Sequence, residues 1–425
     1  MKKEIYETYL QILKDELVPA LGCTEPIAIA FATAKAASLL GKRPDRIEML
    51  CSGNIIKNVQ GVTVPNSGGL KGIEAAAILG AIGGDATKEL KVLEFISDEA
   101  KEETASLLNT GFCTSLLAKG VENLYISTKM YAGEHSVELE IQHLHTNITK
   151  VIVDGKEIIN RPCGIDDSEE DADKDLLNVK DILEFANVVD IDEVREILDK
   201  QISLNTAISD AGLSGNWGAC IGKTIMKMDG DNVIARAKAR AAAGSDARMN
   251  GCPLPVVIVS GSGNQGVTAS MPVIEFAEEL KVDEETMYRA LIISNLVALH
   301  QKKYIGRLSA FCGAVCAACG RGAAITYLYG GDYEAIGRTI VNTIANVGGI
   351  VCDGAKSSCA AKIASSVDAA ILAHNMSMDG IVFEDGEGLV QDDVEQTIRN
   401  IGQVGRIGMH PTDIEILNIM LNMQK

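Results

Sequence analysis

The sequence predicts an α+β protein, in which an N-terminal α/β mixed-sheet region packs on a predominantly helical C-terminal domain rich in glycine and alanine. Two observations lead to this prediction. Between residues 46 and 160, short apolar runs alternate with charged residues, as in half-exposed strands, and helical stretches separate them. From residue 176 onward the pattern is helical and interrupted by glycines. A chain of 425 residues with 41 glycines and 4% aromatic residues favours close packing of small-residue helices.

The chain divides into four predicted segments, and its length is sufficient for two domains. The first segment holds N-terminal helices and carries Cys23, and we expect it to pack on the helical domain. The second is an α+β domain with antiparallel strands, the third an acidic linker and the fourth the helical domain. Their boundaries are 1–45, 46–163, 164–175 and 176–425.

Periodicity predicts individual elements within these segments. Apolar residues at helical spacing indicate helices, and an Asp-Gly pair between two alternating runs indicates a hairpin. The predicted helices are 3–18, 26–40 (with Thr24 as its N-cap), 70–82 and 98–109. The predicted strands are 47–51, 90–96, 137–141 and a hairpin at 150–159 that turns at Asp154 and Gly155.

Charge and cysteine content limit the classes of partner. The net charge of −19 argues against nucleic acid or an anionic membrane surface. No uncharged apolar run reaches the roughly 18 residues of a membrane span, and the N-terminus lacks the apolar part of a secretory signal. Eleven cysteines without such a signal indicate a reducing cytoplasm, and their odd number argues against a disulfide framework. We therefore expect a cytoplasmic protein; the oligomeric state, including a homo-oligomer, stays open.

Three cysteines from two distant segments are the strongest chemical signal. Cys352 and Cys359 flank a short Asp-Gly turn, and Cys359 begins a predicted helix. Backbone N–H groups at such a turn and helix start stabilise anionic sulfur. Cys312 lies 40 positions before Cys352 in a separate glycine- and alanine-rich segment. Three thiols gathered in this way can hold a metal or a cluster and leave one coordination position open.

Two further motifs resemble known kinds of site, but neither fits the pattern of that site. The segment 218–224 imitates a phosphate-binding loop, but three residues separate its glycines where the true pattern has four, and no strand precedes it. Cys312, Cys316 and Cys319 have the spacing of radical enzymes that cleave S-adenosylmethionine, but there the array opens a long α/β barrel. Here a helical pattern follows, and Cys316 and Cys319 are interpreted as small buried hydrophobes.

Zinc and histidine sites are the remaining alternatives. Structural zinc favours cysteine pairs two to four residues apart, whereas six residues separate Cys352 from Cys359. His143 and His145 are expected as exposed polar residues on one face of a strand. Spacing alone leaves both an iron–sulfur cluster and inert buried thiols open.

One further cysteine and two glycine-rich loops are candidates for substrate chemistry. Cys23 is expected just ahead of a helix N-terminus, where a thiolate is favoured. The loop at 66–72 precedes a predicted helix, and the loop at 260–266 follows an apolar strand-like run. Both arrangements suit a carboxylate, although each is also compatible with a plain tight turn.

The combination of these motifs resembles a known family, the L-cysteine desulfidases. The resemblance covers essentially the whole chain and rests on four motifs: Gly22-Cys-Thr-Glu-Pro26, Asn66-Ser-Gly-Gly69, Ser262-Gly-Asn-Gln-Gly266 and Cys352-Asp-Gly-Ala-Lys-Ser-Ser-Cys359. This family is related to the α-chain of the iron–sulfur L-serine dehydratases and includes many uncharacterised bacterial members.

The resemblance implies an oxygen-sensitive [4Fe–4S] cluster held by Cys312, Cys352 and Cys359. Cys316 and Cys319 are nearby alternatives to Cys312 as the third ligand. It also implies that Cys23 is the base, so the first forty residues should pack against the helical half of the chain.

The implied reaction is an α,β-elimination on a small amino acid, independent of pyridoxal phosphate. An open iron would act as a Lewis acid, and the Cys23 thiolate would remove the α-proton, which requires a pKa near the working pH. L-cysteine is the expected substrate and L-serine the alternative; a non-catalytic iron–sulfur or thiol sensor is an alternative of another class. The candidate substrate-binding residues are Asn66, Ser67, Gly68, Ser262, Asn264 and Gln265.

Overall fold

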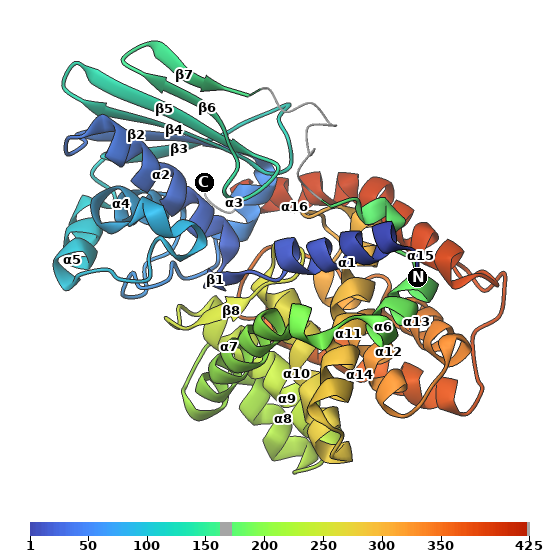
Figure 1. Ribbon diagram of the computed structural model, residues 1–425. Helices are drawn as coiled ribbons and strands as arrows, with labels where there is room; N and C mark the ends of the chain where they lie inside the picture. Colours follow the sequence, from blue (N-terminus) through green and yellow to red (C-terminus); the bar gives the residue numbers. More distant parts are fainter. Residues whose placement is uncertain (162–171, 423–425) are drawn as a thin grey trace.

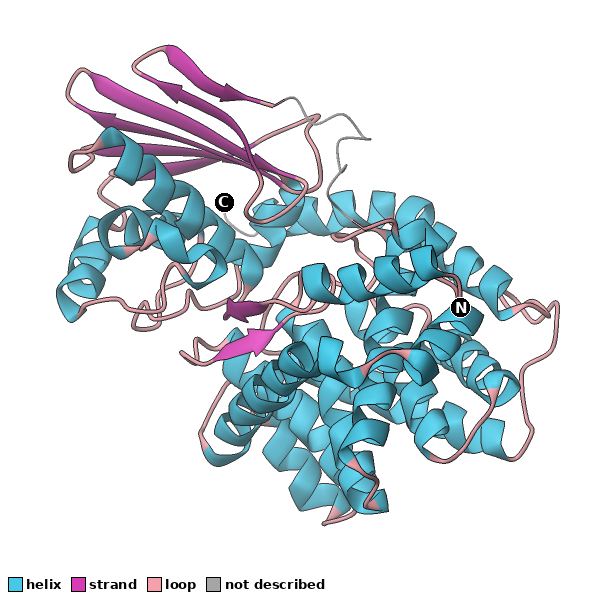
Figure 2. Ribbon diagram, viewed as in Figure 1, coloured by secondary structure: helices cyan, strands magenta, loops and turns pink. Residues whose placement is uncertain are grey.

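The computed structural model describes residues 1–161 and 172–422 and confirms the predicted α+β class (Figures 1 and 2). A six-stranded sheet with its own helices lies beside a large region made almost entirely of helices (Figure 2). Most of the predicted acidic linker, 164–171, lies outside the described residues, and a short 3-10 helix, η2 (Lys174–Leu176), follows it.

The sheet has the strand order β3-β2-β4-β5-β6-β7. Strands β2 and β3 are parallel and all other neighbours are antiparallel. The alternation predicted around residue 139 is confirmed, because every second residue of β5 is buried. The predicted hairpin is confirmed too, with Asp154 and Gly155 both at positive φ in the turn between β6 and β7. The strand bounds are β2 Arg46–Cys51, β3 Cys113–Leu117, β4 Tyr125–Ala132, β5 His135–Gln142, β6 Ile148–Val153 and β7 Lys156–Asn160.

Small-residue helices cover one face of this sheet (Figure 1). Helix α2 packs against β4 and β5 and against the alanine-rich helix α4, and these elements share one buried core with the sheet. Polar side chains cap two of the helices, with Ser52 accepting from Ile55 N at α3 and Ser97 from Ala100 N at α5. The helix bounds are α2 Thr24–Leu40, α3 Gly53–Val59, α4 Ile73–Gly83 and α5 Asp98–Leu107.

The strand predicted at 90–96 is wrong. The chain there forms the end of a 3-10 helix, η1 (Ala86–Lys91), followed by turns. Val92 and Leu93 are both buried although they are adjacent, and Phe95 is 75% exposed, so the burial does not alternate as a strand requires. Glu94 instead pairs with Lys88 across the turn.

The rest of the chain forms the helical region. Its helices pack on one another around a second core, and a third, smaller cluster lies between α9, α10, α12 and α14. Among the described residues, no helix is long and apolar enough to cross a membrane. The bounds are α1 Lys3–Glu16, α6 Val179–Val188, η3 Ile191–Glu193, α7 Arg195–Ser214, α8 Ile221–Asp229, α9 Val233–Met249, α10 Gly263–Leu280, α11 Glu284–Ile305, α12 Gly313–Leu328, α13 Tyr333–Val347, α14 Cys359–Met378, α15 Val394–Gln403, π-helical η4 Val404–Gly408 and α16 His410–Asn422.

Residues 1–45 divide between the two cores. Helix α1 packs into the core of the helical region, whereas α2 packs into the core of the sheet. Between them, strand β1 (Pro19–Leu21) pairs antiparallel with β8 (Pro255–Val257), which leads into the glycine-rich loop before α10. This pairing fixes Cys23 at the junction of the two cores.

A second junction joins α3 to the segment between Cys352 and Cys359. The Lys57 amine is buried and donates to the Cys352 carbonyl oxygen at 3.4 Å and to the Asp413 carboxylate of α16. Gly354 lies against the Lys57 backbone, where a Cβ would come within 2.2 Å of the Lys57 carbonyl oxygen. The loop that carries two of the predicted ligands therefore packs directly on the sheet-bearing half of the protein.

We expect Gly354→Ala to destabilise the protein because it combines this clash with a φ of +94°, which side chains rarely adopt. The expected loss is about 2–4 kcal/mol of unfolding free energy, measured by urea denaturation of the full chain. Gly349→Ala is the matched control, because Gly349 is exposed and its added Cβ would meet no atom within 4 Å. Equal denaturation midpoints for the two variants would show that the contact with Lys57 is unimportant.

Candidate functional site

One cavity of about 100 Å³ gathers most of the predicted site residues, and we call it the central cavity. It lies between the N-terminus of α2, the loop before α10, the start of α12 and the loop before α14. The predicted residues that line it are Cys23, Cys312, Cys352, Cys359, Ser262, Asn264 and Gln265.

A short antiparallel bridge brings Cys312 beside Cys352. Phe311 pairs with Val351, Cys312 N donates to the Ile350 carbonyl oxygen at 3.0 Å, and Cys352 N donates to the Ala310 carbonyl oxygen at 2.6 Å. Cys312 is then the N-cap of α12, and Cys359 is the first residue of α14, as predicted. Local backbone structure thus directs the three thiols into one cavity.

The electrostatics of these thiols suit a cationic ligand. Burial, together with the neighbouring Cys352 and Cys359, raises the pKa of Cys312 to about 12. Burial and Cys352 likewise raise the pKa of Cys359. Lys302 and Lys362 oppose this effect with positive charge close to the thiols. Cys312 and Cys359 are thus costly to ionise alone, and an iron–sulfur cluster would stabilise them as thiolates.

The arrangement of donors differs from that of a single-ion site. Within residues 1–161 and 172–422, no group of three His, Cys, Asp or Glu side chains is arranged to hold a metal ion. A cluster distributes its cysteine ligands over several irons, so its thiols surround a volume and need not converge on one point. The three cavity cysteines meet that requirement in number, and all three line one cavity.

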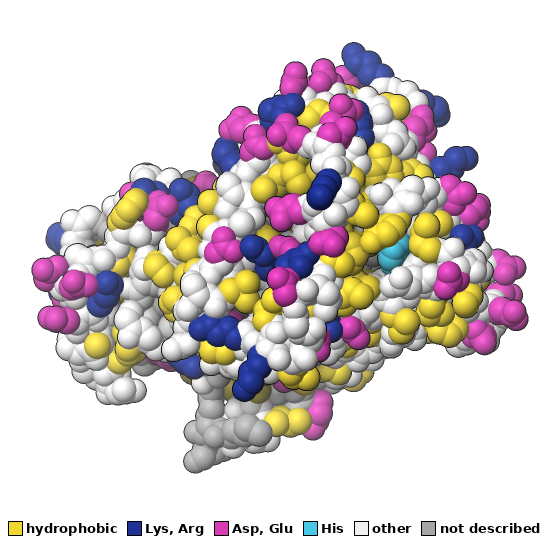
Figure 3. Space-filling view, turned by 90° about the horizontal axis from the view of Figure 1, so that it is seen from below, with side chains coloured by type: hydrophobic (Ala, Val, Ile, Leu, Met, Phe, Trp, Pro, Cys, Tyr) yellow, Lys and Arg dark blue, Asp and Glu magenta, His cyan; other side chains and the backbone are white. Residues whose placement is uncertain are grey.

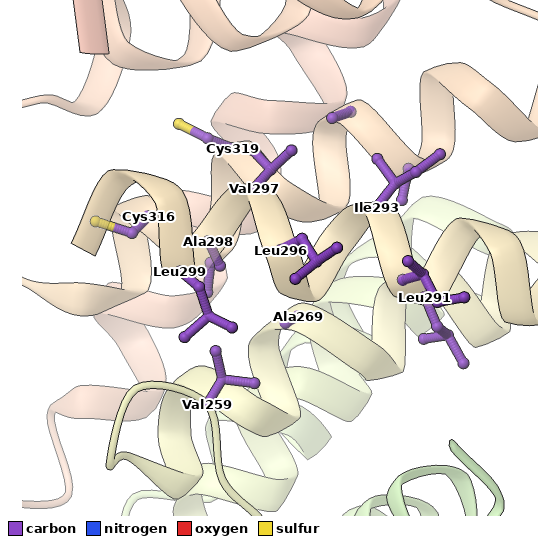
Figure 4. Close-up of a cluster of buried hydrophobic side chains, with 14 of the residues drawn as sticks. Val259, Ala269, Leu291, Ile293, Leu296, Val297, Ala298, Leu299, Cys316 and Cys319 are labelled. Carbon is purple, nitrogen blue, oxygen red and sulfur yellow. The ribbon is translucent and has the colours of Figure 1, made fainter. Parts of the chain in front are cut away.

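Cys316 and Cys319 lie in the core, as predicted. Both are fully buried in the hydrophobic cluster of the helical region, next to apolar residues of α11 (Figure 4). Neither lines the central cavity, whereas Cys312 does. Burial raises the pKa of Cys316 to about 11 and that of Cys319 to about 12.

The environment of Cys23 reverses the expectation of a ready thiolate. Cys23 is the N-cap of α2, and its thiol donates to Glu25 Oε2 at 3.0 Å. Burial, the Glu25 charge and this hydrogen bond raise the pKa of Cys23 well above its ordinary value, although Arg248 opposes them. The predicted cap, Thr24, lies inside the helix and donates to the Gly261 carbonyl oxygen. The thiol is therefore protonated at neutral pH, because a buried anion already lies beside it.

Glu25 is the buried anion in question. Burial alone would raise its pKa, but nearby His145, the Cys23 thiol and Arg248 hold the pKa below its usual range. Its other oxygen, Oε1, accepts from Asn58 Nδ2 at 2.9 Å. Glu25 lines the central cavity together with Asn58 and Arg248. A carboxylate held in this way stays ionised at neutral pH and accepts the hydrogen bond of the adjacent thiol.

The histidine pair is not on an exposed strand face. His143 has a φ of +65° and lies with His145 in the turn between β5 and β6, which Asn147 closes by donating to the Gln142 carbonyl oxygen. His145 is buried against Gly261. Burial lowers the pKa of His145 to about 4; Glu25 opposes this shift, and Arg307 and Arg248 add to it.

Three polar atoms of the lining stand out because they are buried and have no hydrogen-bond partner in the described part of the chain. They are Arg248 Nε, Asn264 Oδ1 and Gln265 Oε1. Two glycines make room for these side chains: a Cβ on Gly263 would lie 2.3 Å from Arg248 Nε, and one on Gly313 would lie 2.5 Å from Gln265 Cδ. Unpaired buried polar groups are costly, so their concentration at one cavity indicates a polar ligand.

The loop predicted at 66–68 lies outside this lining. Asn66 donates to the carbonyl oxygens of Leu93 and Glu94, at 2.7 and 3.0 Å, and Ser67 donates to that of Leu70 at 3.2 Å. The residue just before the loop, Pro65, packs against Gly22. The loop thus lies behind the Cys23 segment, and the structure does not bring Asn66, Ser67 and Gly68 together with the other candidates.

The loop at 218–224 already holds an anion of the chain itself. The buried Asp246 carboxylate accepts from Gly222 N at 3.2 Å and from the N–H groups of Ala219 and Ile221. The backbone groups that would cradle a phosphate are thus occupied, which agrees with the rejection of this motif.

The comparison with known protein families now identifies the chain's relatives. The model of the serine dehydratase alpha chain family matches residues 87–418. The chain belongs to the serine dehydratase alpha chain family. Proteins of this family are iron–sulfur-dependent lyases. The match includes Cys312, Cys352 and Cys359 but begins after Cys23.

Relatives of this protein match it over nearly its whole length. A UPF0597 protein of Lachnoclostridium phytofermentans is 55% identical over 98% of this chain and 100% of its own. UPF0597 proteins of Desulfitobacterium hafniense and Finegoldia magna are 52% and 50% identical over 98% of this chain, and over 97% and 99% of their own.

Sequence reasoning missed several polar residues of the site, among them Glu25, Arg248 and Lys302 in the lining and His145 near Glu25. Glu25 was inside a recognised motif, but its side chain was not considered. Arg248 follows a run of mostly small residues in α9, and a cation there is a usable signal of a buried polar site, whereas Lys302 stands next to Gln301 and Lys303 and gave no such signal. His145 gave no signal, because its position depends on how the β5–β6 turn meets the helical region.

The pKa of His145 leads to a pH prediction. Since the unfolded histidine binds a proton near pH 6.5 and the folded one only near pH 4, this residue costs stability as pH falls through that window. His145→Asn should remove up to about 3 kcal/mol of the acid destabilisation between these pH values. The measurement is urea denaturation of both proteins at pH 7 and pH 4.5. An unchanged difference between wild type and variant at the two pH values would contradict the buried, neutral state of His145.

Proposed function

We propose that this protein is a pyridoxal-phosphate-independent iron–sulfur lyase that converts L-cysteine to pyruvate, ammonia and sulfide. One observation supports this most directly. Three thiols suited to a cluster, a Cys–Glu pair and three unpaired buried polar groups share one cavity small enough for a small amino acid. Membership of an iron–sulfur lyase family supports the same reaction class.

Cys312, Cys352 and Cys359 would hold a [4Fe–4S] cluster through their sulfur atoms and leave one iron without a protein ligand. When bound, the cluster supplies a Lewis acid for the substrate's carboxylate and leaving group. Lys302 and Lys362 place positive charge beside Cys312 and Cys352, which offsets the charge of the thiolates.

The unpaired polar groups match the two ends of an amino acid. Arg248 Nε is a donor for a carboxylate, and Asn264 Oδ1 and Gln265 Oε1 are acceptors for an ammonium group. Ser262, also in the lining, adds a hydroxyl. In this scheme the loop at 66–68 supports the Cys23 segment on the side away from the central cavity.

Proton transfer would begin with the Cys23–Glu25 pair. Once the ammonium group of a bound substrate has lowered its pKa, the Cys23 thiol would release its proton to solvent, and the resulting thiolate, beside Glu25 Oε2, takes the α-proton of the substrate. The electron pair of the broken Cα–H bond forms the Cα–Cβ double bond, and the leaving group departs with the electrons of its bond to Cβ. The aminoacrylate so formed tautomerises to an imine, and water hydrolyses it to pyruvate and ammonia.

L-serine is the second candidate substrate, because the family is that of serine dehydratases. The two reactions differ only in the leaving group, hydroxide or hydrosulfide. Apolar side chains of Leu308, Phe311 and Ile363 line the cavity beside the thiols. Such walls favour a sulfur substituent over a hydroxyl group, which would lose its hydrogen bonds to water.

We predict that the anaerobically purified, brown protein releases equal amounts of sulfide and pyruvate from L-cysteine. Cys23→Ala should keep most of its iron absorbance and lose at least about 100-fold in kcat, because the base is gone. Pyruvate from L-serine alone would assign the dehydratase reaction. No turnover of either amino acid by a brown protein would favour the sensor, and wild-type activity in Cys23→Ala would rule out this base.

The cysteine ligands give a separate prediction. Cys352→Ser should abolish the visible iron–sulfur absorbance after anaerobic reconstitution, because a cavity ligand is lost. Cys316→Ser is the matched control and should retain that absorbance, since Cys316 lies in the core outside the cavity. A wild-type protein that stays colourless after reconstitution would exclude a cluster altogether.

A further inference from the structure

We propose that the substrate reaches the central cavity through a second cavity beside it, and that the side chain of Leu308 is the gate between the two. We call this second cavity the outer cavity; it has a volume of about 230 Å³ and lies between the end of α11 and the segment that joins α15 to α16. The identity of the substrate rests on the proposed function, but the route is a property of the fold.

The two cavities share a wall. Leu308 and Ser309 line both of them, in the irregular segment between α11 and α12. Ser309 Oγ donates to the Gly405 carbonyl oxygen at 2.7 Å, which fixes this residue to the opposite side of the outer cavity. Leu308 is half-buried and its side chain has no polar anchor. Leu308 packs at the edge of the sheet core and lacks the hydrogen bond that holds Ser309, so its side chain can change rotamer without breaking a hydrogen bond.

Exposure increases from the central cavity outward. The groups for catalysis, such as Cys23, Glu25 and Arg248, are buried. The outer cavity includes Arg406 and His410, which are exposed, so it opens to solvent. It also shares His410 with a third cavity of about 350 Å³ that lies between α16 and α3. The central, outer and third cavities have volumes of about 100, 230 and 350 Å³.

The charge of the outer cavity suits an incoming carboxylate. The chain has a net charge of −19, yet this cavity contains Lys303 and Arg406, and Asp413 is its one acidic residue. Asp413 is already paired with the buried Lys57. Arg406 has no ion pair in the part of the chain that the structure describes, and the Lys303 amine donates only to backbone carbonyl oxygens. A local positive potential on an acidic protein concentrates small anions and zwitterions by their carboxylate.

Helix α16 forms the outer edge of this route, between the sheet and the helical region (Figure 1). Charged residues of both signs are interspersed on the face seen in Figure 3. The outer cavity is therefore a first binding position for the carboxylate, ahead of Arg248.

The gate is tested by changing the size of the side chain at position 308. The cluster-free full-length chain is treated with iodoacetamide, which alkylates thiols. Peptide-resolved mass spectrometry gives the alkylation rates of Cys312, Cys352 and Cys359. Leu308→Trp should slow all three by about tenfold or more because indole fills the shared wall, and Leu308→Ala should accelerate them. Ile407→Trp is the control, because Ile407 is 65% exposed and lines none of the three cavities. Its rates should equal those of wild type.

The charge of the route is tested with iodoacetate, which has nearly the size of iodoacetamide and carries a carboxylate. Arg406→Glu should lower the iodoacetate rate about tenfold at low salt and leave the iodoacetamide rate unchanged. Lys227→Glu makes the same charge change at an exposed residue of α8, outside all three cavities, and should leave both rates as in wild type.

The outcomes separate the route from the proposed reaction. Wild-type alkylation rates in both Leu308→Trp and Arg406→Glu would overturn the route, whatever the protein does to L-cysteine. Slower alkylation in these variants, together with no turnover of L-cysteine or L-serine by the loaded wild type, would retain the route and reject the proposed function.

Discussion

The site depends on burying charged groups between two hydrophobic cores. Isolated charges are very costly in such a place, so each must be neutralised or held by hydrogen bonds. Glu25 receives the Cys23 thiol and the Asn58 amide, and Arg248 lies close by. Glu16, also buried, is paired with both Arg307 and Lys174. Because these groups come from the sheet half and the helical half alike, neither half can form the site alone.

The same constraint explains why the loops between the cores are rich in glycine. The Cys352–Cys359 loop meets α3 at the Lys57 backbone, and the Arg248 side chain crosses the start of α10, where any side chain at 263 would collide with it. These close approaches bring the polar groups within reach of one small volume. Hydrogen bonding is incomplete at Arg248, Asn264 and Gln265, whose unpaired atoms represent binding energy that a polar ligand can recover.

The features that depend on local sequence patterns were predicted correctly. The features that depend on how the two hydrophobic cores pack together were missed. The alternation in β5, the Asp-Gly turn at 154–155 and the start of α14 at Cys359 all follow from local chemistry, and all were predicted. The segment at 90–96 has strand-forming residues, but its two buried side chains are adjacent and it pairs with none of the strands in the described residues. His145 was taken for a surface residue because burial by a distant segment leaves no trace in local periodicity. The cavity lining includes the loop at 262–265 but not the similar loop at 66–68, and no feature of the two sequences distinguishes them.

The protonated state of Cys23 changes how the base must work. An N-terminal helix position favours a thiolate by a modest amount, whereas burial next to a carboxylate disfavours it far more strongly, so the second effect decides. A permanently ionised thiol facing an empty cavity would also be open to oxidation and alkylation. Keeping the proton on Cys23, in its hydrogen bond to Glu25, avoids that state, and the thiol can still be ionised once a substrate ammonium group adds positive charge nearby. The pKa of Cys23 then falls only when the substrate is present, which couples formation of the thiolate base to occupancy of the cavity.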